Sequence, residues 1–370
     1  MFKIIFTIII ILHGLIHILG FAKAFNLAKL EQLSIAISRP VGALWLLSVA
    51  LFALTAFLFA TNKSWWWMMA LATVVLSQML IILSWSDAKF GTLPNIIIVV
   101  VAAVSIGAFL MDNEFTGVVK HNFSTNNNLT TGILAESDIA HLPAPVQKYL
   151  RYTGSVGKPK VKNFRAEFIG GIRSNPGDDY MKVSSVQYNF YEKPARFFYM
   201  TASKMGLPAA ALHIYQNITA TFRVKLLNWF KVVDAKGEKM TQGETVTVFN
   251  DMCFIAPATL IDKRIEWESI DHLTVKAGYT NENIKISATL YFNEKGELIN
   301  FISSDRYHID GKNYYNYPWS TPVSDYKEIN GYLLPSKTKL IYATPNGDFT
   351  YGELEYKDLR YNLENLAIPK

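Results

Sequence analysis

The sequence predicts an α-helical transmembrane bundle of four spans, followed by an α+β domain in which a large curved antiparallel sheet packs on a helix. Hydrophobic residues make up 50% of the 370 residues, and charges are scarce between positions 4 and 111. From Val161 onward, apolar residues recur with a period of two, as in half-buried strands. We therefore expect a four-helix transmembrane domain at 1–111, a polar linker at 112–135 and an extracytoplasmic, mainly β domain at 136–370.

Four apolar segments are each long enough to cross a bilayer core, which takes about 20 helical residues. They lie at residues 4–21, 41–60, 65–85 and 93–111. Tryptophans at both ends of the third segment are typical of an aromatic belt at the membrane surface. The first segment is longer than the apolar core of a signal peptide, roughly 7–15 residues, and three more spans follow it closely. We therefore expect it to stay in the bundle rather than to be cleaved.

The distribution of cations predicts the orientation in the membrane. The first and third loops carry four of them, Lys23, Lys29, Arg39 and Lys89. The opposite side carries Lys3 and Lys63 near the spans. Because cytoplasmic loops are enriched in Lys and Arg, the first and third loops are expected in the cytoplasm. The expected location is a bacterial inner (cytoplasmic) membrane, with the β domain on the extracytoplasmic or periplasmic side.

Two histidines, His13 and His17, lie four residues apart in the first span and therefore share one helix face. Two hypotheses follow. The pair could ligate a metal or haem, which would make the chain a membrane redox protein. Alternatively, it could form hydrogen bonds between helices, as intramembrane polar groups normally do. The four spans contain no third histidine, so we favour the structural pair and expect no metal and no cofactor.

The part after the linker is predicted to form a short helix at 145–152 and then mostly strands. Strands are expected at 164–173, 183–191, 196–202, 338–343 and 349–361. In the stretch ATFRVKLL, Phe222 and its alternate neighbours form one apolar face. Two polar turns, TNEN and NEKG, separate three alternating runs between positions 273 and 303. This pattern predicts a meander of antiparallel strands with one dry face.

One segment, 242–254, breaks the period of two and predicts a helix laid against the sheet. Thr241 and Glu244 have the spacing of a capping box, and Pro257 would end the helix. Val246, Phe249 and Cys253 recur at helical spacing. A curved sheet around such a helix has an apolar interior that fills with side chains or holds a ligand. The expected lining of such a site is Phe222, Val246, Phe249, Cys253, Ile286 and Leu290.

Evidence for catalysis is lacking, and we name no catalytic residues. Cys253 could act as a nucleophile with His213, His272 or His308, but a lone cysteine on an apolar helix face is far more often core. A polar pocket could form from four separated residues, Glu244, Asp251, Arg306 and Asp325, although their spacing does not require it. Trp267 and Trp319 are expected to be packing anchors. The basic residues form no block, so nucleic acid is not an expected partner.

Longer motifs resemble known bacterial families. HGLIHILGFAKAF and WSDAKFGTLPN resemble an uncharacterised family of four-span inner-membrane proteins. LPAPVQKYLRYTGSVGKP, GETVTVFNDMCFIAPATLI and YPWSTPVSDYKEINGYLLP resemble a domain of unknown function. The sheet-around-helix plan is similar to the lipoprotein-localisation-factor fold, whose members bind lipid or acyl chains. The resemblance implies a hydrophobic ligand, and membrane lipids or an envelope protein or lipoprotein as partners. A purely structural or sensory envelope role is a further alternative.

Overall fold

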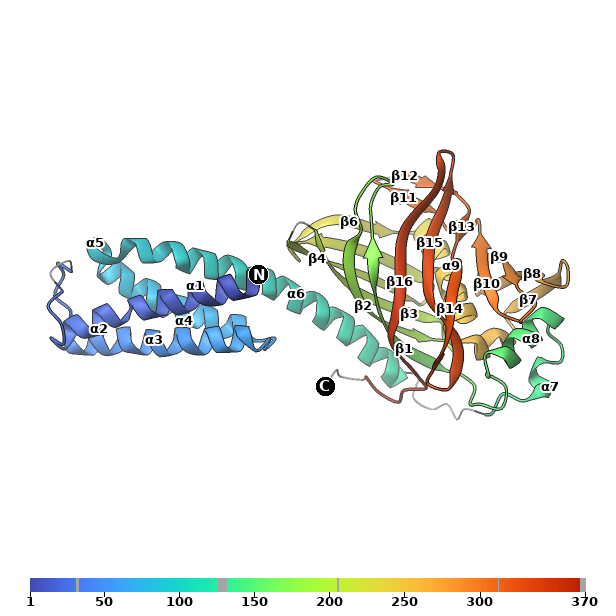
Figure 1. Cartoon of the computed structure of the whole chain (residues 1–370), viewed down its shortest axis with the longest axis horizontal. Coiled ribbons are helices and arrows are strands. Elements are labelled where there is room, and N and C mark those ends of the chain that lie inside the picture. The colour runs from blue at the N-terminus through green and yellow to red at the C-terminus, as the bar shows by residue number, and fades with distance from the viewer. Residues whose placement is uncertain (31–32, 126–131, 205, 312, 367–370) are drawn as a thin grey trace. The chain divides into compact units, whose positions relative to one another are not determined.

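The computed structural model describes residues 1–30, 33–125, 132–204, 206–311 and 313–366. The chain divides into two compact units, Met1–Leu110 and Met111–Lys370. The first unit is helical, and the second contains all of the β-strands described below (Figure 1).

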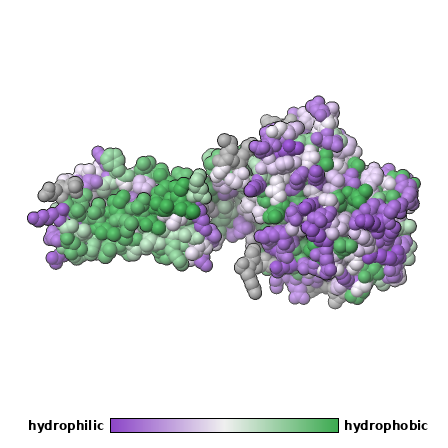
Figure 2. All heavy atoms as spheres, in the orientation of Figure 1, coloured by the Kyte–Doolittle hydropathy of each residue, from purple (hydrophilic) through white to green (hydrophobic). Residues whose placement is uncertain are grey.

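The first unit contains four long apolar helical stretches at the positions of the four predicted spans. Its elements are α1 (Phe2–Ile16), α2 (Ile18–Ala24), α3 (Arg39–Ala60), α4 (Trp66–Leu83), α5 (Trp85–Ala88), η1 (Lys89–Gly91) and the start of α6 (Thr92–Thr125). By length and composition, four stretches could cross a membrane, namely Phe2–Ala24, Arg39–Ala60, Trp66–Leu83 and Trp85–Thr125. The face of this unit in Figure 2 is largely hydrophobic. Such a surface fits lipid better than water, because isoleucine and leucine side chains point outward from it.

Close packing of α2 against α3 depends on a glycine. A Cβ added at Gly42 would lie 2.2 Å from the Cβ of Ala24, a distance that two carbon atoms cannot keep. Small residues at such contacts let membrane helices approach closely.

Replacing Gly42 with alanine is therefore expected to destabilise the helical unit by about 1–3 kcal/mol, because the two helices must separate. The midpoint of denaturation of the full chain in SDS, followed by its helical circular dichroism, measures the loss. The double variant Gly42→Ala, Ala24→Gly moves the methyl group across the contact and should recover most of the stability. A double variant as unstable as the single one would contradict the packing.

The second unit contains one large antiparallel sheet, which confirms the predicted fold class. Its strand order is β6-β5-β4-β3-β2-β1-β16-β15-β13-β10-β9-β8-β7, with β14 paired to β15. The first strands are β1 (Asn163–Ile172), β2 (Met181–Phe190), β3 (Ala195–Lys204), β4 (Leu207–Gln216), β5 (Thr219–Leu226) and β6 (Phe230–Lys236). The predicted meander is β8 (Thr274–Asn281), β9 (Ile284–Phe292) and β10 (Leu298–Ser303), preceded by β7 (Ile265–Ser269). The remaining sheet strands are β13 (Trp319–Ser320), β14 (Val323–Ile329), β15 (Tyr332–Thr344) and β16 (Gly347–Tyr361).

A long helix, α9 (Glu238–Phe254), lies inside the curve of this half-barrel, as predicted (Figure 1). Phe249 packs its ring 5.4 Å from that of Tyr279 on β8 and 5.7 Å from that of Phe301 on β10. The predicted capping box is wrong, because the helix begins one turn earlier, after Gly237. Glu244 consequently lies in the middle of the helix and makes other contacts, described below.

Smaller elements complete the second unit. The predicted helix at 145–152 is present as α8 (Ala144–Tyr152), preceded by α7 (Glu136–Ile139). A 3-10 helix, η2 (Pro257–Ile261), begins at the proline predicted to end α9. A separate hairpin is formed by β11 (His308–Asp310) and β12 (Asn313–Tyr315).

The predicted polar linker at 112–135 requires a correction. Residues 112–125 continue helix α6, while 126–131 lie outside the described part of the chain. Phe115, Val119 and Phe123 of α6 pack within the second unit on side chains of β2, β3 and β4. Their spacing of four residues forms an apolar stripe that the surrounding polar residues obscured in the sequence. This helix covers the outer face of the sheet at these strands, which leaves their other face for the interior.

Candidate functional site

The inner face of the half-barrel encloses a cavity of about 750 Å³ between the sheet and α9. Much of its wall is apolar and comes from alternate residues of β3, β4, β5 and β6, namely Phe198, Met200, Ala209, Phe222, Val224, Leu226 and Val233. The alternation follows from the strand period, which sends every second side chain inward. Six of the lining residues are exposed, so the cavity opens to solvent: Ser174, Asn175, Val232, Lys239, Gly311 and Lys337.

Helix α9 presents a polar side to this cavity and an apolar side to the core. The polar side consists of Gly243, Glu244, Thr247, Asn250 and Asp251, which all line the cavity. The apolar side carries the core residues Val246, Phe249, Met252 and Cys253. The cavity therefore combines an apolar wall from the strands with a polar floor from the helix.

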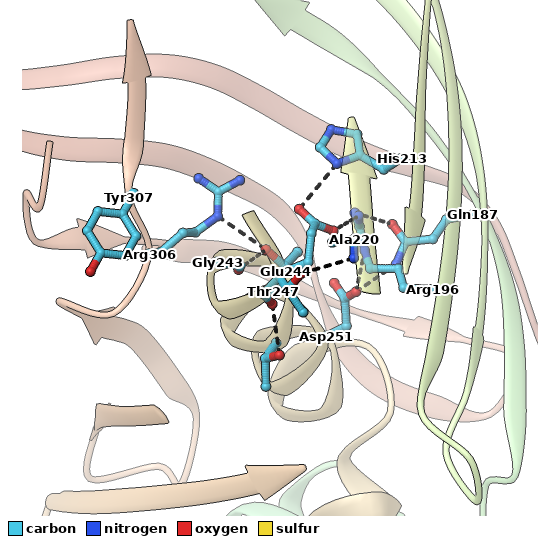
Figure 3. A network of polar contacts seen from close by, with 12 residues as sticks. Gln187, Arg196, His213, Ala220, Gly243, Glu244, Thr247, Asp251, Arg306 and Tyr307 are labelled. Atoms are coloured by element: carbon cyan, nitrogen blue, oxygen red, sulfur yellow. Dashed lines mark hydrogen bonds and ion pairs between the residues drawn. The ribbon is translucent and has the colours of Figure 1, made fainter. Parts of the chain in front are cut away.

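A polar cluster joins the floor to the wall, and we use the name buried polar cluster for Gln187, Asn189, Arg196, His213, Glu244 and Asp251, of which all but Asn189 are labelled in Figure 3. Five of the six are buried, and the side chain of His213 is 14% exposed. Arg196 of β3 lies at the centre of the cluster. Its Nη1 donates to Oε2 of Glu244 at 2.9 Å, and its Nε donates to Oδ2 of Asp251 at 3.0 Å. The same Asp251 oxygen accepts hydrogen bonds from the amides of Gln187 at 2.8 Å and Asn189 at 2.9 Å.

The two carboxyl groups of the cluster respond differently to burial. Burial alone would raise the pKa of Glu244, but the neighbouring His213 and Arg196 hold that pKa well below its usual value. For Asp251, burial outweighs Arg196 and raises the pKa of the carboxyl group. The Nδ1 atom of His213 lies 3.2 Å from Oε1 of Glu244, and the imidazole stacks on Phe222 with ring centroids 3.8 Å apart. Glu244 thus remains a paired, buried anion.

A second arginine, Arg306, lies over the other side of the helix floor. Its Nε donates to the Thr247 hydroxyl at 3.2 Å, and its Nη1 donates to the Tyr342 hydroxyl. The guanidinium also stacks on the ring of Trp319, at 4.5 Å from the ring centroid. Figure 3 shows the two terminal nitrogens of Arg306 pointing away from α9. This side chain lines the cavity without belonging to the buried polar cluster.

The hairpin β11–β12 contributes to the mouth of the cavity. Tyr307, Ile309 and Tyr314 all line it. The ammonium group of Lys239, at the start of α9, lies 5.3 Å from the ring centroid of Tyr307 and 5.5 Å from that of Tyr314. Ile309, like Phe222, packs against an apolar cluster that includes Ala220 and Met240.

Of the six side chains predicted to line a ligand site, Phe222 lines this cavity. The other five, Val246, Phe249, Cys253, Ile286 and Leu290, are fully buried in the core on the far side of α9. The physical reason is that α9 turns its apolar face to the meander β8–β10, so that its polar face meets the cavity. The sequence pattern identified the apolar face correctly but did not indicate what covers it.

The polar candidates are distributed differently. Glu244, Asp251 and Arg306 all line the cavity, although Arg306 is far from the other two in sequence. Asp325 does not join them, because it pairs with Lys327 at 2.8 Å on the surface. Burial raises the pKa of the Cys253 thiol, which makes it a poor nucleophile.

Sequence reasoning missed Arg196, Gln187 and Asn189. A signal existed in the run VQYNF of β2, where Gln187 and Asn189 alternate with apolar residues. In a typical half-exposed sheet, the apolar face of a strand is the inner one. In this domain the apolar residues Tyr188 and Phe190 instead face α6. The polar residues are therefore turned inward and find their partner in Asp251 on α9.

The histidine pair of the first unit forms hydrogen bonds between helices. His13 Nε2 lies 2.9 Å from Oδ1 of Asn95 on α6, and His17 Nε2 lies 2.9 Å from Oγ of Ser77 on α4. Asn95 also donates to Gln78 at 3.1 Å. Sequence reasoning did not single out Asn95, although it lies in the predicted fourth span. Across the described residues, no group of three or more His, Cys, Asp or Glu side chains is arranged to hold a metal ion.

Replacing His13 or His17 singly with glutamine should leave the protein in the membrane, with a stability loss of about 0.6 kcal/mol, because an amide can still bond across helices. An amide is a poor substitute for imidazole at a transition metal. Elemental analysis and a visible spectrum of the parent and both variants make the test. Stoichiometric metal or a Soret band in the parent, lost in either variant, would contradict the structural pair.

The fold and the site define a class of protein: a half-barrel domain with an internal cavity, preceded in the chain by four apolar helices long enough to cross a membrane. The chain belongs to a family of unknown function, DUF6544, which it matches over residues 132–354.

Solved structures with a similar fold are also found. One is a LolA superfamily protein from Nitrosomonas europaea, with 10% sequence identity, a TM-score of 0.30, and 60% of this chain and 94% of that chain covered. Another is a DUF1329 family protein from Desulfovibrio piger, with 9% identity, a TM-score of 0.28, and 60% and 92% covered. The comparison with curated proteins gives no match.

Proposed function

We propose that the half-barrel domain binds the acyl chain of a lipid or of a similar hydrophobic ligand in its cavity. The observation that carries this proposal is the apolar wall contributed by β3–β6 to a cavity of about 750 Å³. Cavities that bind small molecules measure roughly 300–1,000 Å³, and they combine apolar walls with a few polar groups. The buried polar cluster supplies such groups on the helix floor.

Energetics favour binding and exchange over active transport. Each buried CH₂ group is worth about 0.8 kcal/mol against water, but a bilayer already offers that environment. Transfer of an acyl chain from membrane to cavity is therefore nearly neutral. The sequence contains no nucleotide-binding motif that could drive it. We infer that the domain takes up, holds or presents its ligand, with membrane lipids or an envelope lipoprotein as partner.

The four helices would hold the domain at the surface of a bacterial inner membrane. The excess of Lys and Arg in the first and third loops supports an extracytoplasmic, periplasmic position of the half-barrel domain. In this position the half-barrel domain would be on the same side of the membrane as the outer leaflet, from which it could take up lipid.

Photo-crosslinking of the full chain in lipid nanodiscs tests the proposal. The probe is a long-chain fatty acid with a diazirine at the end of its chain, and mass spectrometry locates the adducts. We expect adducts on peptides of β3, β4 and β5 as well as on the membrane helices. Labelling of the helices serves as the internal standard for the probe concentration in the bilayer.

A pair of tryptophan variants provides the control. Ala209→Trp fills the cavity from β4 and should strongly reduce the adducts on β3–β5. Thr201→Trp adds the same side chain at an exposed position on β3 and should leave them unchanged. Adducts confined to the membrane helices in the parent protein would refute acyl-chain binding, as would equal labelling in both variants.

A further inference from the structure

The cavity contains an arginine without a carboxylate partner. Within the described part of the chain, the hydrogen bonds of Arg306 go to neutral groups, the hydroxyls of Thr247 and Tyr342. Among the described residues, no carboxylate lies within ion-pairing distance of it, and Glu244 acts on it only at longer range. The other terminal nitrogen of Arg306, Nη2, donates no hydrogen bond to any of the described residues. Because a guanidinium has five donors and stays charged, Arg306 retains unused capacity for an anion.

Arg196 shows the contrast. Arg196 is buried and is neutralised by Glu244 and Asp251, and its Nη2 donates a hydrogen bond to the Gln187 side-chain oxygen at 3.1 Å. Among the described residues, Arg196 therefore has carboxylate partners within the protein, whereas Arg306 has none.

The lining as a whole carries an excess of positive charge. Five of the described lining residues are Lys or Arg, namely Arg173, Arg196, Lys239, Arg306 and Lys337. Two are carboxylates, Glu244 and Asp251. A partly enclosed site with this imbalance favours a negatively charged ligand, because low-dielectric walls strengthen the field of the charges.

The immediate surroundings of Arg306 match an amphiphile rather than a free anion. The guanidinium stacks on Trp319 at 4.5 Å, and apolar residues such as Phe222, Val224 and Leu340 line the same cavity. A ligand with an oxyanion at one end and an alkyl chain at the other satisfies both parts. A free anion would leave the apolar wall without a partner.

We propose that the ligand of this cavity is an anionic amphiphile, of the long-chain carboxylate class, whose acidic head group binds Arg306. This inference rests on the proposed function and specifies the chemistry of the ligand. The carboxylate would accept charge-assisted hydrogen bonds from the terminal nitrogens of the guanidinium, while the chain packs on the strand wall. A hydrogen bond to a charged group is worth more than one between neutral groups, by enough to give roughly tenfold in affinity.

The experiment compares two diazirine probes of equal chain length, a fatty acid and the corresponding alcohol, on the full chain in nanodiscs. Labelling of β3–β5 is divided by labelling of the membrane helices. We expect the ratio to be about tenfold higher for the acid in the parent protein. In the Arg306→Gln variant, the labelling ratio of the acid probe should fall to that of the alcohol probe, and the ratio of the alcohol probe should stay unchanged. Arg306→Lys, which keeps the charge, should retain part of the preference.

Controls separate the head group from general effects of charge. Lys339→Gln removes the same charge from an exposed position outside the cavity and should keep the preference for the acid. Millimolar inorganic phosphate should not displace the acid probe, and displacement would mean that Arg306 serves a free anion instead. Equal labelling of β3–β5 by the acid and the alcohol in the parent protein would overturn the binding of an acidic head group at Arg306, but not the binding of an acyl chain in the cavity. Labelling of β3–β5 by neither probe refutes acyl-chain binding itself.

Discussion

Replacing Phe249 with aspartate is expected to destabilise the half-barrel domain by about 4–5 kcal/mol or more, the largest effect we anticipate. Phe249 is 0% exposed, stacks on the ring of Tyr279 and meets the ring of Phe301 edge to face. Removing a buried phenylalanine side chain alone costs about 3–5 kcal/mol. The variant in addition buries a carboxylate without a partner. A loss of this size can exceed the whole stability of a domain.

Cys253 makes this loss measurable in the full chain. It is the single cysteine of the sequence and is 0% exposed beside Phe249, so its thiol reacts only when the domain opens. The rate of thiol labelling in increasing urea therefore reports the stability of the half-barrel domain separately from that of the four N-terminal helices. Phe230→Asp, at a residue of β6 that is 65% exposed, is the matched control and should have little effect. If the Cys253 thiol of the Phe249→Asp variant is labelled as slowly as that of this control, the described packing of α9 against the sheet is wrong.

Replacing Arg196 with methionine is expected to lower the free energy of unfolding by about 3–5 kcal/mol, because it leaves Glu244 and Asp251 buried without their cation. Methionine keeps most of the volume, so the loss is electrostatic rather than a cavity effect. The same Cys253 labelling measures it.

Two further variants make the cause of this loss specific. Arg151→Met removes an exposed ion pair with Glu136 and should cost less than about 1 kcal/mol. Adding Glu244→Gln and Asp251→Asn to Arg196→Met should recover part of the stability, because the unpaired charges disappear. An unchanged stability of Arg196→Met would mean that the carboxylates are solvated and that the floor of the cavity is not closed as described.

Local patterns were sufficient to predict the elements whose signals lie within one segment. The four spans follow from their length and apolarity, and the meander β8–β10 follows from alternation around two polar turns. Helix α9 was recognised from Val246, Phe249 and Cys253, and all three are buried in the core. These features depend on the period of a single helix or strand, which the sequence contains directly.

Features that depend on contacts between distant segments could not be predicted in this way. The continuation of α6 through Phe115 and Phe123 is stabilised by β2–β4, which follow it at a distance in the chain. The site depends on Arg196 meeting Asp251, 55 residues later. Because α6 covers the outer face of β2, the polar residues of that strand turn inward, against the usual expectation. The position of the cavity on the polar side of α9 follows from the same contacts.

The most direct test of the account is a crystal structure of the full chain with a long-chain fatty acid that carries bromine at the end of its chain. Anomalous scattering locates the bromine independently of the protein density. We expect a bromine peak inside the half-barrel, against the apolar wall near Phe222 and Val224, with the carboxylate at Arg306. Bromine found only along the membrane helices, with the cavity filled by water, would contradict it.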